Sequence, residues 1–259
     1  HRLMKRALRL VERSARVYRQ GWKRSVALTF VQPALMLAAM GLGLGALVDR
    51  GTAVLPGGVS YLTFLAPGLL AATCMQAACY ESSFPVNGRL NWHGSYLAIA
   101  GTPMRVLDIV LGEVGWVGVR LTLVASAFLL VSVAFGASRS WLALAAIPSA
   151  VLTGLAFCAP VLAYSGTLSR SGNYNAMFRF IITPLFLFSG VYFPIERMPA
   201  WLQSVARATP LYHGVELTRG LSLHTLTWPE AGAHALYLLV LLAAGVAAAS
   251  WTFTRKLTA

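Results

Sequence analysis

Three charged side chains fall inside one long apolar stretch of this chain. Asp108, Glu113 and Arg120 lie between residues 107 and 135, where most other residues are apolar. Ionisable groups at membrane depth are costly, so they mark functional sites or internal ion pairs. Asp108 and Glu113 stand near the start of the stretch, whereas Arg120 lies deeper, about two helical turns after Glu113 on a similar face. We therefore expect Glu113 and Arg120 to form an intramembrane charge pair, structural rather than substrate-binding.

The other polar residues show no pattern typical of a catalytic centre. No lysine follows a glycine, which excludes the phosphate-binding loop of an ATPase. His213 and Glu216 are three residues apart, but two ligands are too few for a metal site. The histidines are otherwise scattered, at His1, His93, His213, His224 and His234. We expect the chain not to be an enzyme and to hold no metal or cofactor.

The composition is that of a membrane protein. Of the 259 residues, 57% are hydrophobic and 11% are charged, and the mean hydropathy is +0.66. Soluble domains usually carry about 25% charged residues. The 21 Lys and Arg residues outnumber the 8 Asp and Glu residues, and the basic residues flank apolar runs. Anionic lipid headgroups therefore suit them as partners, and nucleic acid does not.

Several apolar runs meet the roughly 20 residues that a helix needs to cross the hydrocarbon core. We predict an all-α integral membrane protein with six transmembrane helices, at residues 25–48, 59–80, 107–135, 141–165, 174–193 and 232–253. Basic loops favour the cytoplasm, and basic residues crowd the first 24 positions. Both termini are therefore predicted to be cytoplasmic, in a multi-pass protein of the cell membrane.

The basic residues of the amino-terminal stretch recur at spacings of three and four. At 100° per residue they fall on one face, opposite leucine, valine and alanine. Residues 1–24 are thus predicted to form an amphipathic interface helix, with Arg9, Arg13 and Arg16 on its charged face. It could act as a membrane-surface anchor alone or also dock a partner.

The segment before the last span is broken by prolines. Pro194, Pro199 and Pro210 delimit two short helical stretches, 200–208 and 211–221, neither of which can span a membrane. Such broken helices are typical of re-entrant hairpins, which we predict for residues 194–221. The alternative is an ordinary surface hairpin outside the bilayer.

Three motifs together carry a resemblance to a known family. They are Tyr-Leu-Ala-Ile-Ala-Gly-Thr-Pro-Met-Arg at 96–105 with Val-Leu-Asp-Ile following, Ser-Gly-Val-Tyr-Phe-Pro at 189–194 with Met-Pro-Ala-Trp-Leu-Gln at 198–203, and Thr-Pro-Leu-Tyr-His-Gly-Val-Glu at 209–216 followed by Arg219. Over nearly its whole length the chain resembles the permease subunits of ABC-2 type exporters, particularly the nodulation-factor and daunorubicin-exporter branch.

The resemblance implies a function and partners. Such a permease moves a drug, glycolipid or lipid-linked saccharide across the cell membrane by alternating access, as a dimer with two copies of a separate ABC nucleotide-binding subunit that binds ATP and Mg. Residues 25–259 would be the transmembrane domain, with a cytoplasmic coupling loop at 81–105 and an extracytoplasmic re-entrant segment at 194–221. The alternative is a secondary transporter or a non-transporting membrane scaffold.

The resemblance also implies site residues. In the coupling loop, the exposed apolar residues are expected to contact the ATPase subunit, although Tyr96 and Leu97 could instead lie in the membrane interface. Residues 82–93 lack the Glu-rich sequence that is common at this position in the family. The ATPase contacts are expected at Arg89, Trp92, His93, Tyr96 and Leu97. The outer gate is expected at Pro194, Glu216 and Arg219.

Overall fold

The computed structural model describes residues 31–32, 34–45, 59–91, 96, 105–137, 141–168 and 174–258. The elements in this part of the chain are all helical. In chain order they are η1 (Leu37–Leu44), α4 (Tyr61–Ser82), α5 (Phe84–Asn91), α7 (Val106–Ala134), η3 (Trp141–Ala145), α8 (Ala146–Thr167), α9 (Tyr174–Met177), η4 (Phe178–Ile182), α10 (Thr183–Phe188), η5 (Ile195–Arg197), α11 (Ala200–Ala208), α12 (Pro210–Leu223) and α13 (Trp228–Thr258).

Four helical stretches within the described ranges are long and apolar enough to cross a membrane. They are Tyr61–Asn91, Val106–Ala134, Ala143–Thr167 and Trp228–Leu257, which correspond to the second, third, fourth and sixth predicted spans. The predicted fifth span is shorter than expected, because its apolar helix, Tyr174–Phe188, ends before the turn at Gly190. Of the predicted first span, residues 31–32 and 34–45 are helical and the rest lies outside the described residues.

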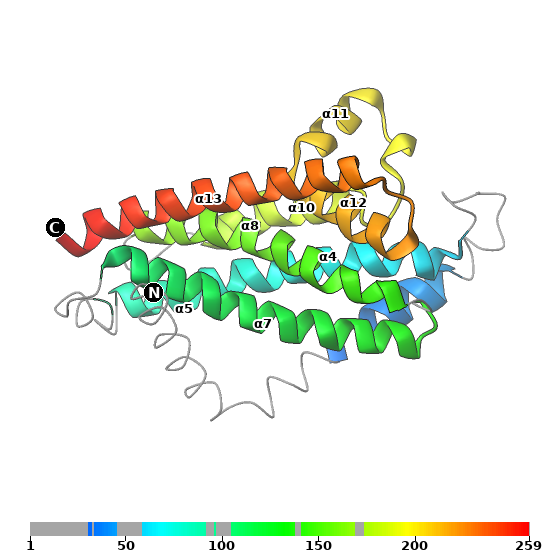
Figure 1. The fold of residues 1–259 in the computed structure, drawn as a ribbon, viewed down its shortest axis with the longest axis horizontal. Helices are drawn as coiled ribbons and strands as arrows, with labels where there is room; N and C mark the ends of the chain where they lie inside the picture. Colours follow the sequence, from blue (N-terminus) through cyan, green and yellow to red (C-terminus); the bar gives the residue numbers. More distant parts are fainter. Residues whose placement is uncertain are drawn as a thin grey trace.

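The long helices α4, α7, α8 and α13 run side by side as an elongated bundle (Figure 1). α8 is its centre, since it packs against α13, α4 and α7. Small residues allow this close packing: a methyl group at Gly154 of α8 would overlap Leu121 and the Cys74 backbone. We name the end of the bundle that holds Ser82, Val106 and Thr258 the inner end, and the opposite end, with Tyr61 and Trp228, the outer end.

Prolines shape α4 at two points. Ser60 caps its start by accepting from the backbone N–H of Thr63, and Pro67 lies inside the helix. At the inner end the helix stops at Ser82, since Ser83 leaves helical geometry with φ −100° and ψ −92°. The short helix α5 then begins at Phe84, and Pro85, which has no N–H to donate, lies in its first turn. α4 and α5 thus form a broken rod rather than one straight helix.

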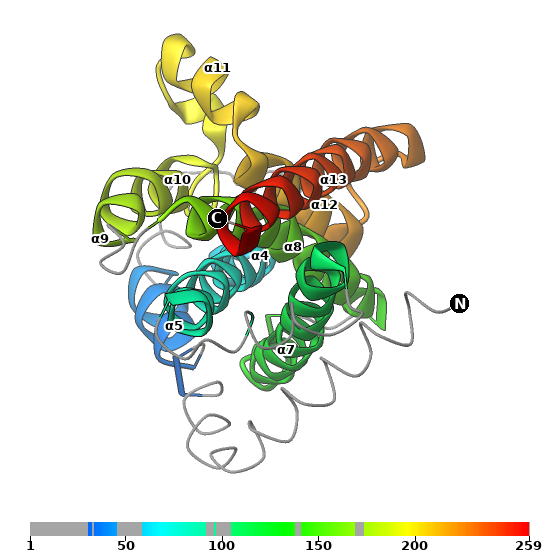
Figure 2. The ribbon, with the colours of Figure 1, turned by 90° about the vertical axis from the view of Figure 1, so that its left-hand side faces the viewer.

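The two short helices predicted before the last span are confirmed, at Ala200–Ala208 and Pro210–Leu223. Thr209 caps α12 by accepting from the Tyr212 N–H, and Pro210 occupies the first turn, where no hydrogen bond is lost. α12 packs against α4, α8 and α13, whereas α11 projects sideways from the bundle (Figure 2). The re-entrant course of this segment through a membrane stays a prediction.

Candidate functional site

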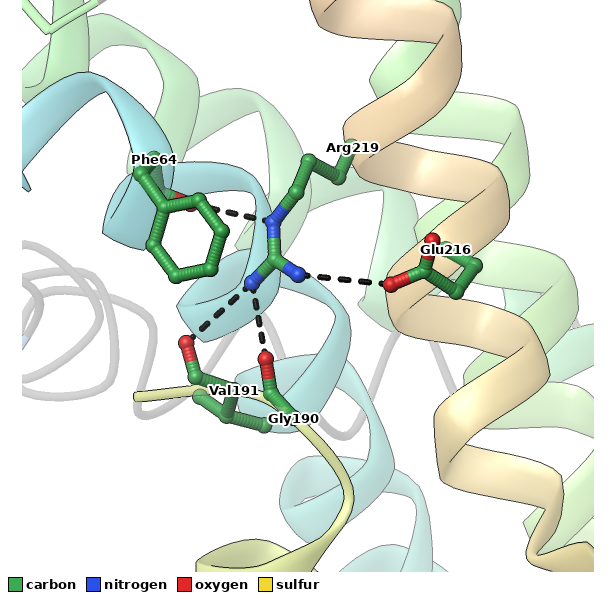
Figure 3. A network of polar contacts seen from close by, with 5 residues as sticks. All are labelled: Phe64, Gly190, Val191, Glu216 and Arg219. Atoms are coloured by element: carbon green, nitrogen blue, oxygen red, sulfur yellow. Dashed lines mark hydrogen bonds and ion pairs between the residues drawn. The ribbon is translucent and has the colours of Figure 1, made fainter. Parts of the chain in front are cut away.

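The predicted gate residue Arg219 is the centre of a buried junction at the outer end (Figure 3). Its Nε donates to the Phe64 carbonyl oxygen of α4 at 3.2 Å. One terminal nitrogen donates to the carbonyl oxygens of Gly190 and Val191 at 2.9 and 3.2 Å, and the other lies 3.4 Å from the Glu216 carboxylate. The guanidinium also lies over the Phe64 ring, 3.8 Å from its centroid. Arg219 thereby joins α12, α4 and the turn after α10.

Two glycines make room for this arrangement. Gly190 has φ +77°, a left-handed conformation that favours glycine, and it turns the chain back after α10. At Gly68, a Cβ atom would lie 2.8 Å from an Arg219 terminal nitrogen and 3.0 Å from the Val191 carbonyl oxygen. Nearby, the Tyr61 hydroxyl donates to the Tyr192 carbonyl oxygen at 3.2 Å. The turn is therefore linked to α4 directly at Tyr61 and, through Arg219, at Phe64.

The electrostatics of this junction favour a fixed positive charge. Burial lowers the pKa of Arg219 to about 10, while Glu216 and Glu196 act in the opposite direction. The guanidinium therefore stays protonated at neutral pH. A buried charge is tolerated only when it is paired and hydrogen-bonded, and here backbone carbonyl oxygens supply most of the acceptors.

At the inner end, Glu113 of α7 is the acceptor for two residues of the predicted coupling loop. Arg89 of α5 donates to its Oε1 at 2.8 Å, and the Tyr96 hydroxyl donates to the same oxygen at 2.6 Å. Arg89 also donates to the Pro85 carbonyl oxygen at 3.2 Å, within its own helix. Tyr96 is 1% exposed, so the expectation that it is an exposed partner contact is wrong. Its hydroxyl turns inward because the buried carboxylate needs donors.

Arg120, which lies seven residues after Glu113 in α7, makes a second ion pair. Its Nε and one terminal nitrogen donate to Glu81 Oε1 of α4, at 3.2 and 2.9 Å. The predicted pairing of Glu113 with Arg120 is therefore wrong: each residue pairs with a different helix instead. Seven residues of helix separate the two by about 10 Å along the axis, whereas α4 and α5 bring opposite charges directly alongside.

Hydroxyl groups connect α8 and α9 to the break after α4. The Ser165 hydroxyl lies 2.8 Å from the Ser82 carbonyl oxygen, and the Tyr174 hydroxyl donates to Ser165 at 2.8 Å. The Ser82 hydroxyl in turn donates to the Cys158 sulfur at 3.1 Å. The inner end thus holds a polar layer inside an otherwise apolar bundle, which ties the helix break to its neighbours.

The family model described as ABC-2 type transporter matches residues 6–223. The chain belongs to this family. It is 34% identical over 208 residues to Nodulation protein J of Rhizobium leguminosarum bv. trifolii, covering 78% of this chain and 77% of the relative. It is 31% identical over 207 residues to Nodulation protein J of Rhizobium meliloti (strain 1021), with coverage of 78% and 77%. A membrane transport component is the role that this family indicates.

Several predicted site residues of this ABC-2 type transporter chain lie outside the described residues. These are Arg9, Arg13 and Arg16 of the predicted interface helix, and Trp92, His93 and Leu97 of the coupling loop. Pro194 is described and stands at the start of η5, between the Gly190 turn and α11. No group of metal-ligating side chains that could hold an ion occurs within the described ranges.

Sequence reasoning missed the partners of the charged residues. Phe64 and Gly68 lie in an apolar span. Phe64 contributes its backbone carbonyl oxygen and Gly68 leaves space for the guanidinium, and the residue types reveal neither contribution. Glu81 was placed at the start of a loop, although it ends a helix beside α7. An unpaired arginine in an apolar segment could have prompted a search for carbonyl acceptors near prolines and glycines. Pro67 and Gly190 are such positions.

Proposed function

We propose that this chain is the transmembrane permease subunit of an ATP-driven exporter. Its membership of the ABC-2 type transporter family supports a transport role. The substrate class proposed is a drug, a glycolipid or a lipid-linked saccharide. Relatives are named Nodulation protein J, which favours a substrate that serves nodulation. Among the three classes we therefore favour a lipid-linked saccharide.

The proposed assembly contains two permease chains and two copies of a separate nucleotide-binding subunit. That subunit would bind ATP and Mg, because no lysine of this chain follows a glycine as a phosphate-binding loop requires. The assembly is proposed to lie in the cell membrane with the inner end of the bundle toward the cytoplasm. The exposed basic residues of that end, Arg105, Arg179 and Arg255, support this orientation.

The observation that carries the proposal is that α4 connects both polar junctions. At the inner end, α4 and α5 are bound to α7 through the Glu81–Arg120 and Arg89–Glu113 pairs. At the outer end, α4 holds Arg219 at Phe64. The 17 residues from 64 to 81 separate the two junctions by about 26 Å of helix. A push on α5 by an ATPase subunit would therefore move α4 and reach the outer turn, as alternating access requires.

The proposal is tested by purifying the tagged chain from its native membranes in mild detergent. We expect a polypeptide with a phosphate-binding loop to co-purify in equimolar amount, and the complex to hydrolyse ATP. Inverted membrane vesicles of the same host should accumulate the exported compound when ATP is added. Accumulation driven by a proton gradient without ATP would instead support a secondary transporter and contradict the proposal.

A variant in the coupling loop makes this test specific. Leu97→Asp would bury an unpaired carboxylate in a docking pocket, and it should therefore reduce co-purification of the ATPase. Leu144→Asp is a suitable control, because Leu144 is 60% exposed at the outer end, far from the coupling loop. Wild-type recovery and wild-type ATP hydrolysis with Leu97→Asp would remove this loop from the proposed contact.

A further inference from the structure

A cavity of about 430 Å³ opens at the inner end, between the last turns of α8 and α13. Its walls are formed by residues 166–168 of α8 and by Trp251, Thr252, Arg255 and Lys256 of α13. The two helices touch at its floor, because a methyl group at Gly166 would overlap the Thr252 side chain. The cavity therefore lies between two helices that are in direct contact.

The cavity is strongly basic. Of the described residues that line it, two are cations and none is a carboxylate. Within the described part of the chain, neither Arg255 nor Lys256 forms a salt bridge. Lys256 donates to the Leu168 carbonyl oxygen at the end of α8, which leaves two of its three N–H donors available. The guanidinium of Arg255 lies over the Trp251 ring, 4.6 Å from its centroid.

The carbonyl ends of two helices also lie near the cavity, and these oppose an anion. Each helix end carries roughly half a negative charge, and Lys256 already satisfies one carbonyl there. Two full positive charges outweigh this effect. The site therefore favours an anion that accepts several hydrogen bonds, as a phosphate group does.

An exposed apolar stripe leads from this basic site along α13. Val240, Ala244, Ala247, Trp251 and Arg255 recur at spacings of three and four, and all are exposed. They lie on one face of the helix, which runs about 16 Å from Val240 to Trp251. Two small residues, Ala244 and Ala247, lie between the larger side chains of Val240 and Trp251 on this face. A phosphate group at Arg255 would thus continue into an apolar chain along this stripe, and Trp251 has the amphipathic character of a membrane-interface residue.

We infer that this cavity binds the phosphate group of an anionic phospholipid, whose acyl chain lies along the exposed stripe of α13. The Arg255 guanidinium offers a planar pair of donors to the phosphate, and Lys256 adds a second charge. This site lies at the opposite end of the bundle from the Arg219 junction, and the inference from it does not depend on the export proposal.

Native mass spectrometry of the full chain, delipidated in mild detergent, tests this inference with phosphatidylglycerol as the probe. Removing a charge-assisted hydrogen bond weakens binding by about tenfold or more. We expect Arg255→Gln to lose one bound phosphatidylglycerol and to raise the apparent Kd about tenfold. Arg255→Lys, which keeps the charge without the planar fork, should give an intermediate Kd. Phosphatidylcholine, which carries a compensating cation, should bind this site weakly in every variant.

Arg179→Gln is the matched control. Arg179 is also exposed and lies over an aromatic ring, Phe180, at 5.9 Å, but it is outside the cavity. This variant should retain the wild-type Kd, and all variants should keep the wild-type melting temperature. An equal Kd for wild type and Arg255→Gln, or an equal loss in Arg179→Gln, would overturn the inference. Displacement of the lipid by millimolar inorganic phosphate would overturn it too, since the site would then take a soluble anion.

Discussion

Arg219 shows how a single charge can be held inside an apolar bundle. Its nitrogens meet three backbone carbonyl oxygens and one carboxylate, and an aromatic ring covers its face. Bidentate and forked contacts of this kind are possible for arginine and not for lysine. The position also depends on Gly68, because any side chain there would occupy the space of the guanidinium.

Replacing Gly68 with alanine should therefore destabilise the protein. The added methyl group would lie 2.8 Å from an Arg219 nitrogen and 3.0 Å from a backbone oxygen, which cannot both move away. We expect a loss of about 1–3 kcal/mol, seen as a lower melting temperature in detergent. Gly118→Ala is the control, since its nearest atom would lie at an ordinary 3.8 Å. Equal melting temperatures for the two variants would contradict this account.

A histidine pair joins α12 to α13 near the same end. The Nδ1 atoms of His213 and His234 are 2.8 Å apart, so one ring must donate and the other must accept. Tyr237 stacks on His213, with ring centroids 4.0 Å apart, and Tyr212 packs beside both histidine rings. Two carboxylates, Glu216 and Glu230, interact electrostatically with His234. The two imidazoles therefore cannot both be protonated in this geometry.

The pair predicts a loss of stability in acid. Burial, and then His234, lower the pKa of His213 below its ordinary 6.5, while a hydrogen bond to the Arg207 backbone opposes them. The pKa of His213 is lower in the folded state than in the unfolded state. The stabilisation that neutral His213 contributes is therefore present above about pH 6.5 and is lost as the pH falls through the folded-state pKa. The melting temperature should therefore drop between pH 7.5 and 5.5. In His213→Asn, whose amide can still accept from His234, the drop should be smaller; an unchanged drop would exclude His213 as its source.

Among the elements, α4 takes part in the polar contacts at both ends of the bundle. Its outer half carries Phe64 and Gly68 of the Arg219 junction, and its last turn carries Glu81 and Ser82 of the inner polar layer. The break at Ser83 and Pro85 lets α5 turn Arg89 toward α7. Two charge pairs rather than one therefore fix α4 and α5 against α7.

A charge exchange distinguishes these pairs from the one expected from the sequence. Glu81→Arg or Arg120→Glu alone should each cost about 1–3 kcal/mol, because the remaining partner is left partly buried without its hydrogen bonds. The double variant Glu81→Arg/Arg120→Glu should recover much of the wild-type melting temperature. The exchange Glu113→Arg/Arg120→Glu should not recover it, since those side chains do not meet. Recovery by the second exchange alone would contradict the observed pairing.

At the scale of the whole molecule, charge is distributed unequally between the ends of the bundle. The described inner end carries the exposed Arg105, Arg179 and Arg255. The outer end carries Arg197 and Arg207 together with Glu196 and Glu230. Positive charge on cytoplasmic loops is the general rule in multi-pass proteins. The two ends should therefore face opposite compartments, with the inner end in the cytoplasm.

Single cysteines test this orientation directly. The native Cys74, Cys79 and Cys158 are buried and would first be replaced. In intact cells, a membrane-impermeant maleimide should label Trp228→Cys, whose parent residue is 86% exposed at the outer end. It should label Arg105→Cys, at the start of α7, only after permeabilisation. Labelling of both variants from the same side would refute the predicted orientation.

The sequence by itself determined the features that depend on neighbouring residues. Length and hydropathy are local properties, so four of the six predicted spans lie close to the observed candidate spans. Prolines act within one turn, and they located the helices at 200–208 and 210–223 to within about two residues. The motifs around them were sufficient to indicate the family.

Only the tertiary structure decided which groups meet. Glu113 binds Arg89 and Tyr96, and Arg120 binds Glu81, because α4 and α5 pack beside α7 and bring these atoms within 3 Å. Arg219 is bound largely by backbone carbonyl oxygens, which every residue possesses and which no residue type reveals. The partner of a buried charge depends on helix packing between distant segments. Spacing along one helix could not predict it, since the nearest opposite charge lay on another helix.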